Sequence, residues 1–195
     1  LSYIDLQSGY VFINDNREEE GLSVWDFNGE KIALLSNESD IFIDKANVAF
    51  SPDTKKVAVA RLGKFPRVWD LSTQTYVDLQ GHESEISTIT FSPDNQYIAT
   101  SSLDHTARIW DSKGRELARL QDHQDKVLSV VFSPDRELIA TASLDKTIRI
   151  WNRQGQQIAV FQGDEPYAYS GELLFSPDGE KIAADTSKRR IHIWD

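Results

Sequence analysis

The sequence contains no cysteine and only four histidines in 195 residues. Without cysteine, the protein can form no disulfide and offers no thiolate nucleophile or cysteine-ligated zinc. The histidines are His82, His105, His123 and His192, which lie in separate segments of the sequence. We therefore expect neither a histidine metal site nor any other cofactor.

Long apolar runs and an excess of positive charge are also missing. No apolar stretch approaches the roughly 20 residues that span a bilayer, and residues 1–7 do not resemble a secretory signal. The 31 acidic residues outnumber the 21 basic ones, which gives a net charge of −10. Nucleic acids and anionic membranes both need a positive patch, so neither is expected as a partner. These features predict a soluble, cytoplasmic, globular chain.

The motifs of common catalytic sites are absent as well. The sequence has no glycine-rich phosphate loop, no nucleophile elbow and no paired-carboxylate motif. An acidic run at residues 18–20 and a basic run at residues 188–190 are short, and we expect both to lie in solvated turns. The sequence therefore does not predict an enzyme.

What the sequence does have is a regular repeat. Its five tryptophans are spaced 41 to 44 residues apart, and four of them are followed by aspartate. They are Trp25, Trp69, Trp110, Trp151 and Trp194. A second marker, Phe-Ser-Pro-Asp, begins 19 residues before each of the last four tryptophans. A fixed period of about 40 residues is typical of a repeat architecture.

Within one repeat the apolar residues follow the two-residue period of β-strands. Residues 86–91, 97–101, 107–110 and 116–120 are predicted strands, separated by turns that use Pro93, Asp104 and Gly114 among others. No segment shows a convincing helical stripe. Each unit is therefore four short antiparallel strands. One such sheet cannot bury its apolar face alone, and a radial stack of sheets forms a β-propeller.

Two central repeats carry the clearest motifs. The first has Gly81-His82, Phe91 to Asp94, Leu103-Asp104 and Trp110-Asp111, and the second has Asp122-His123, Phe132 to Asp135, Leu144-Asp145 and Trp151-Asn152. The chain resembles the WD-repeat (β-transducin-like) family over essentially its whole length, in the style of prokaryotic, cyanobacterial repeats. The resemblance implies an all-β propeller with four full four-stranded blades and a fifth blade that lacks its outer strand. The expected blades are residues 1–36, 37–80, 81–121, 122–162 and 163–195.

The resemblance also implies a role for the recurring histidine and aspartate. They superficially resemble parts of a hydrolase triad, but in this family they join the tryptophan N–H and a strand hydroxyl in a buried structural network. The members here are His82, Asp104 and Trp110 in one blade, and His123, Asp145 and Trp151 in the next. The hydroxyl is Thr100, Ser101 or Ser102 in the first blade and Thr141 or Ser143 in the second, and the sequence does not choose among them.

Partners of such propellers usually bind at one rim or at the mouth of the central channel. Alignment with the family places six candidates on that rim: Phe42, Phe65, Tyr167, Tyr169, Leu103 and Leu144. The four aromatic residues lie outside the repeat consensus, in irregular loops of the second and fifth blades. Exposed aromatic side chains make good anchors for a protein partner. The alternative is that they fold back and cover the ring.

The leading expectation is a non-catalytic protein–protein interaction scaffold, serving as the sensor or docking module of a larger signalling protein. Two alternatives remain. One is glycan or small-ligand binding at the propeller channel, and the least favoured is a propeller enzyme. An enzyme would need convergent carboxylates or histidines on the innermost strands, and strand residues 127–132 are apolar or carry hydroxyls.

The repeat period bears on ring closure. At this period the chain contains about 4.8 repeats, whereas rings of the family usually have seven. An open arc would leave two apolar blade faces in water. Together with the absence of an initiator methionine, this predicts a part of a seven-bladed ring, closed by further blades of the parent chain or by a second copy. A closed five-bladed monomer is the alternative.

Overall fold

The computed structural model describes residues 2–5, 10–15, 21–36, 48–61, 64–163, 173–186 and 190–195. Among these residues the side chains of 23–34, 48–61, 65–163, 173–186 and 190–195 are placed. In the described ranges all regular secondary structure is β-strand. No helix long and apolar enough to cross a membrane occurs there.

The strands form five separate antiparallel sheets, here called blades 1 to 5 in chain order. Blade 1 contains β1 (Ser2–Asp5), β2 (Tyr10–Asp15), β3 (Gly21–Asp26) and β4 (Lys31–Ser36). Blade 2 contains β5 (Val48–Phe50), β6 (Lys56–Arg61), β7 (Lys64–Asp70) and β8 (Thr75–Asp78). Blade 3 contains β9 (Ile86–Phe91), β10 (Tyr97–Ser102), β11 (Ala107–Asp111) and β12 (Glu116–Leu120). Blade 4 contains β13 (Val127–Phe132), β14 (Leu138–Ser143), β15 (Thr147–Asn152) and β16 (Gln157–Gln162), and blade 5 contains β17 (Leu173–Phe175), β18 (Ile182–Asp185) and β19 (Ile191–Trp194).

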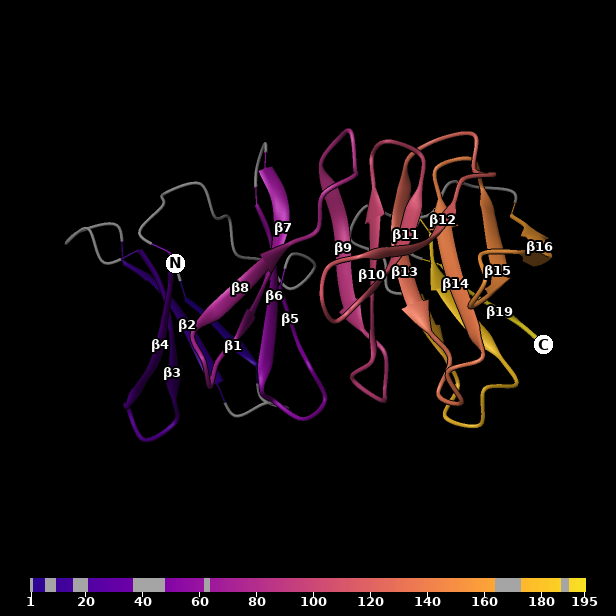
Figure 1. The fold of residues 1–195 in the computed structure, drawn as a ribbon. Coiled ribbons are helices and arrows are strands. Elements are labelled where there is room, and N and C mark those ends of the chain that lie inside the picture. The colour runs from indigo at the N-terminus through magenta and orange to yellow at the C-terminus, as the bar shows by residue number, and fades with distance from the viewer. Residues whose placement is uncertain are drawn as a thin grey trace.

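The order of strands within each blade follows the chain, so every blade is a simple up-and-down meander. The predicted all-β architecture is confirmed, with four four-stranded blades and a fifth blade of three described strands. The seven-bladed ring stays a prediction. The strands expected in blade 3 agree with the observed ones to within one residue at each end. Figure 1 shows the indigo blade 1 at the left with blade 2 beside it, while blades 3 to 5 overlap at the right of the view.

The Ser-Pro-Asp turn is built by its own side chains. In blade 3, Ser92 Oγ donates to the Asp94 carboxylate at 2.6 Å and accepts the backbone N–H of Tyr97 at 2.9 Å. The left-handed backbone of Asn95, with φ of 64°, closes the turn. The same serine–aspartate hydrogen bond recurs in blades 2, 4 and 5. Each of these turns therefore connects the first two strands of its blade in the same way.

Apolar side chains between neighbouring blades form the core. Between blades 3 and 4, Ala99, Ile109 and Leu120 pack with Ile139 and Trp151 of the next sheet, and all five are at most 2% exposed. Similar clusters join blades 1 and 2, blades 2 and 3, and blades 4 and 5. Because each core lies between two sheets, the stability of a blade depends on its neighbour.

Candidate functional site

The structure brings the motif residues of blade 3 into one buried chain of hydrogen bonds. His82 Nδ1 lies 2.7 Å from Asp104 Oδ2, and His82 Nε2 lies 2.8 Å from Thr100 Oγ1. The indole N–H of Trp110 donates to the same Thr100 hydroxyl at 2.9 Å. Thr106 also donates to Asp104, at 2.7 Å. These hydrogen bonds join the loop before β9 to strands β10 and β11.

Blade 4 repeats the arrangement almost atom for atom. His123 Nδ1 lies 2.9 Å from Asp145 Oδ2, and His123 Nε2 lies 2.7 Å from Thr141 Oγ1, which accepts the Trp151 indole N–H at 2.8 Å. A neutral histidine with its proton on Nδ1 gives every group a partner: tryptophan donates to threonine, threonine to histidine, and histidine to aspartate. Thr147 donates to Asp145 at 2.6 Å.

The network is built for rigidity rather than for reaction. Thr100 and Thr141 are both 0% exposed, so a substrate has no access to either hydroxyl. Each hydroxyl accepts the tryptophan N–H and directs its own proton to the histidine Nε2. A fully satisfied buried network fixes the strands that contribute to it. The network therefore holds the strands of blade 3 and of blade 4 in fixed positions.

The network also shifts the ionisation of its members. Burial alone would raise the pKa of Asp104 and Asp145, but the hydrogen bonds from histidine and threonine outweigh it and hold both values well below the usual range. Burial lowers the pKa of His123, and the hydrogen bond and charge of Asp145 offset this only in part. The folded protein therefore favours a charged aspartate beside a neutral His123.

The shift at His123 predicts a loss of stability in mild acid. Its folded pKa lies below the unfolded value of about 6.5, so below that pH the unfolded chain takes up the proton more readily. The free energy of unfolding should therefore fall as the pH drops from neutrality, and His123→Gln should flatten that dependence. Urea unfolding followed across this range measures both. An equally steep dependence in His123→Gln would assign it to other groups.

Blade 2 contains a pair of arginines that share one aspartate. Arg61, whose side chain is only 4% exposed, donates from Nη2 to Asp78 Oδ1 at 3.1 Å and from Nε to the carbonyl of Phe65 at 3.0 Å. Arg67 pairs with both oxygens of Asp78, at 2.7 and 3.0 Å, and its guanidinium lies 3.7 Å from the centre of the Tyr76 ring. The pair ties β6 and β7 to the outer strand β8.

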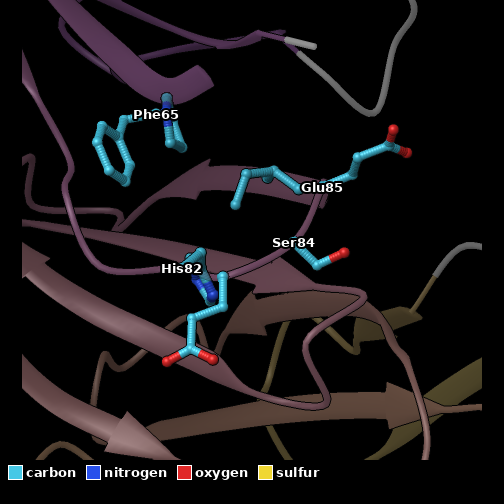
Figure 2. A pocket seen from close by; sticks show the side chains of 7 residues that line it. Phe65, His82, Ser84 and Glu85 are labelled. Atoms are coloured by element: carbon cyan, nitrogen blue, oxygen red, sulfur yellow. The ribbon is translucent and has the colours of Figure 1, made fainter. Parts of the chain in front are cut away.

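A groove opens where blades 2 and 3 meet at the rim, and Phe65 forms one of its walls. Its volume is about 350 Å³, and its lining residues are Phe65, Pro66, His82, Glu83, Ser84, Glu85 and Ile86. Figure 2 shows Phe65 on one side and His82, Ser84 and Glu85 on the other. Phe65 is 40% exposed, whereas Pro66 is buried. Among the residues whose side chains are placed, the lining contains two glutamates and no lysine or arginine, so it combines an apolar wall with negative charge.

Hydrogen bonds from blade 3 hold the opposite wall in place. The backbone N–H of Glu83 donates to Asp104 Oδ2 at 3.1 Å, the Ser102 hydroxyl donates to the carbonyl of Ser84, and the N–H of Leu103 donates to the carbonyl of Glu85. The buried network thus fixes the groove as well as the blade. A wall that is already ordered loses little entropy when a partner binds.

The other predicted rim residues are only partly described. Leu103 and Leu144 lie in the turns after β10 and β14, half-buried, and the N–H of Leu144 donates to Lys126 as that of Leu103 does to Glu85. Phe65 is the second residue of β7, so its expected place in a loop was wrong. Phe42, Tyr167 and Tyr169 lie outside the described residues.

Several residues of the site were not predicted from the sequence. Thr106 and Thr147 complete the two networks, and their shared place two residues after the aspartate is a repeat signal that could have revealed them. The Arg61–Asp78 pair has no such signal, because blade 2 departs from the repeat there. Among the described residues, no group of three or more acidic or histidine side chains is placed to hold a metal ion.

Comparisons with known proteins agree with this picture. The WD domain, G-beta repeat, family matches residues 72–111 and 114–152. Each matched segment runs from the outer strand of one blade through the first three strands of the next. No curated protein matches the sequence.

A solved structure of a designed protein has a similar fold over almost the whole chain. The crystal structure of the computationally designed Ika8 protein is similar over 98% of this chain, with a TM-score of 0.77 and 20% sequence identity. The chain spans 56% of the designed chain, and at this identity the likeness shows the fold alone. The chain therefore contains two WD repeats, at residues 72–111 and 114–152, within a fold that it shares with a designed propeller.

Proposed function

We propose that the protein is a non-catalytic docking module that binds a protein segment in the groove between blades 2 and 3. WD repeats generally act as protein–protein interaction scaffolds, and their propellers are typically non-catalytic. The observation that carries the proposal is the exposed Phe65 ring across the groove from an ordered loop, whose exposed Glu85 carboxylate points away from Phe65. Signalling within a larger cytoplasmic protein would fit such a module and belongs to the same proposal.

The lining of the groove indicates the chemistry of the segment. Phe65, Pro66 and Ile86 offer a surface for one aliphatic or aromatic side chain. Glu83 and Glu85 are exposed at the wall and favour a neighbouring lysine or arginine. The protein as a whole carries a net charge of −10, which would speed the approach of a basic partner. The expected ligand is an extended segment with an apolar anchor next to a basic residue.

Blade 4 offers a matched control on the same rim. Gln124, Asp125 and Lys126 occupy the positions of Glu83, Ser84 and Glu85, and they are anchored by the same three hydrogen bonds, to Asp145, Ser143 and Leu144. A change of charge there alters the rim without touching the groove. It therefore separates binding in the groove from a general effect of surface charge.

A selection of displayed random peptides on the immobilised protein tests the proposal. The selected peptides should pair apolar and basic residues, and Phe65→Ala should lower their affinity by about 10- to 100-fold, as fluorescence polarisation would measure. The double variant Glu83→Lys, Glu85→Lys should also weaken binding, while Gln124→Lys should leave it nearly unchanged. If no peptide is enriched, or if the groove variants bind as well as the parent, the proposal fails.

A further inference from the structure

The hairpin between β3 and β4 contains the one Asn-Gly pair of the sequence, Asn28-Gly29. Asn28 is exposed, and Gly29 has a left-handed backbone with φ of 82°. Lys113 and Gln154 take the place of Asn28 in the hairpins of blades 3 and 4, and both are exposed although a blade precedes each of them. The exposure of Asn28 therefore follows from its place in the hairpin and does not depend on the position of blade 1 in the chain.

An asparagine followed by glycine is able to react with its own main chain. The Gly29 nitrogen attacks Asn28 Cγ, a C–N bond forms, and the bond from Cγ to Nδ2 breaks. Ammonia leaves with the proton of the Gly29 nitrogen, and a five-membered succinimide ring remains. Water then opens the ring at either carbonyl, which gives aspartate or isoaspartate. Glycine favours the reaction because it has no Cβ to crowd the ring, and water is the only co-reactant.

The equivalent hairpins of blades 3 and 4 lack this chemistry. They contain Lys113-Gly114 and Gln154-Gly155. The lysine side chain has no carbonyl to attack, and the glutamine would have to close a less favourable six-membered ring. In both hairpins the glycine N–H lies 3.0 Å from the carbonyl oxygen three residues before it, whereas the Gly29 N–H lies 3.2 Å from the Asp26 carbonyl. The nitrogen that has to attack is therefore also the least tightly held of the three.

We propose that Asn28 is a modification site, which deamidates in the folded protein to aspartate and isoaspartate. The amide that is lost now donates from Nδ2 to Asp26 Oδ2 at 3.0 Å. Asp26 Oδ1 accepts the backbone N–H groups of Asn28 and Glu30, at 2.9 and 2.8 Å. The product would place a second carboxylate against Asp26, so a hydrogen bond is replaced by repulsion between like charges. The reaction also adds one negative charge to a chain that carries −10.

The isoaspartate product changes the main chain as well as the charge. Its main chain passes through the former side-chain carbon, so the loop between the paired strands becomes one carbon longer. The pair nearest the loop is Trp25 with Lys31, and Val24 pairs with Ala33 further along. Val24 is 0% exposed and belongs to the core between blades 1 and 2. A longer loop should therefore loosen the pairing of β3 with β4 next to that core.

Timed incubation of the folded 195-residue chain, followed by digestion and peptide mass spectrometry, tests the proposal. The peptide with Asn28 should convert to two acid products at least about 10-fold faster than the peptides with Asn95 and Asn152. Those two asparagines are internal controls, because glutamine and arginine follow them. Conversion should speed up as the pH rises, since the Gly29 nitrogen has to lose its proton. The variant Asn28→Gln should stay unconverted.

The same incubation in urea separates the reactivity of the pair from the effect of the hairpin. Conversion of Asn28 in urea but not in the folded chain would show that the hairpin protects it, and would overturn the proposal. Conversion of Asn28 no faster than that of Asn95 in the folded chain would overturn it as well. Amide hydrogen exchange then tests the consequence: β3 and β4 should exchange faster in the converted protein than in Asn28→Gln. Equal exchange would overturn the inferred loosening of the hairpin.

Discussion

Replacing Thr141 with valine is expected to lower the free energy of unfolding by about 2–5 kcal/mol. The change keeps the shape of the side chain but removes the hydroxyl that serves both His123 Nε2 and the Trp151 indole N–H. Both partners are buried, so each would be left without its hydrogen bond in a place that water does not reach. Since small proteins are stable by only about 5–15 kcal/mol, the loss is a large fraction of the total.

Urea unfolding of the purified variant measures this loss, with Thr75→Val as the control. Thr75 is exposed, and its hydroxyl contacts only that of Thr73, so its replacement should change the stability by less than about 0.5 kcal/mol. Thr100→Val removes the equivalent hydroxyl in blade 3 and should cost as much as Thr141→Val. A Thr141→Val protein as stable as the Thr75→Val control would show that the network contributes no net stability.

The repeat explains why so much of the fold was predictable. The tryptophan spacing, the Ser-Pro-Asp turns and the two-residue period each recur, so an error in one repeat is corrected by the others. The ends of the blade 3 strands were accordingly placed to within a residue.

The choice of network hydroxyl depends on strand register, which the sequence does not state. Trp110 lies opposite Ile98 in the neighbouring strand, so its indole reaches Thr100, two residues further along the same face. Ser101 points to the other face, and Ser102 is two residues beyond Thr100. The β11–β12 pairing also shifts its register between Ile109 and Trp110. Only the paired strands could therefore select Thr100.

The groove at Phe65 was only partly predictable for a similar reason. Its aromatic wall stands outside the repeat consensus, which marked it as a candidate. The hollow itself depends on how closely the loop before β9 approaches β7, and that is set by contacts between two blades. Arg61 donates a hydrogen bond to the Phe65 carbonyl, and no equivalent bond occurs in the other described blades. Features that occur once cannot be inferred from a repeat pattern.

The ion pairs of Asp78 with Arg61 and Arg67 in blade 2 give the second large expected effect. Asp78→Ala should lower the free energy of unfolding by about 2–4 kcal/mol. Asp78 is the shared counter-charge of Arg61 and Arg67, and its own pKa is lowered chiefly by the hydrogen bond from Arg67. Without it, two positive charges would remain close together, one of them with a side chain only 4% exposed. The loss falls below that for a fully buried pair because Asp78 itself is 24% exposed.

The exposed pair of Arg153 and Glu137 provides the matched comparison. Their side chains are 36% and 62% exposed, so Glu137→Ala should cost less than about 1 kcal/mol in the same urea titration. Asp78→Asn keeps the size of the side chain and part of its hydrogen bonding, and it should fall between the two. If Asp78→Ala costs no more than Glu137→Ala, blade 2 is held by its apolar contacts alone, and the arginine pair serves only to position the Phe65 backbone.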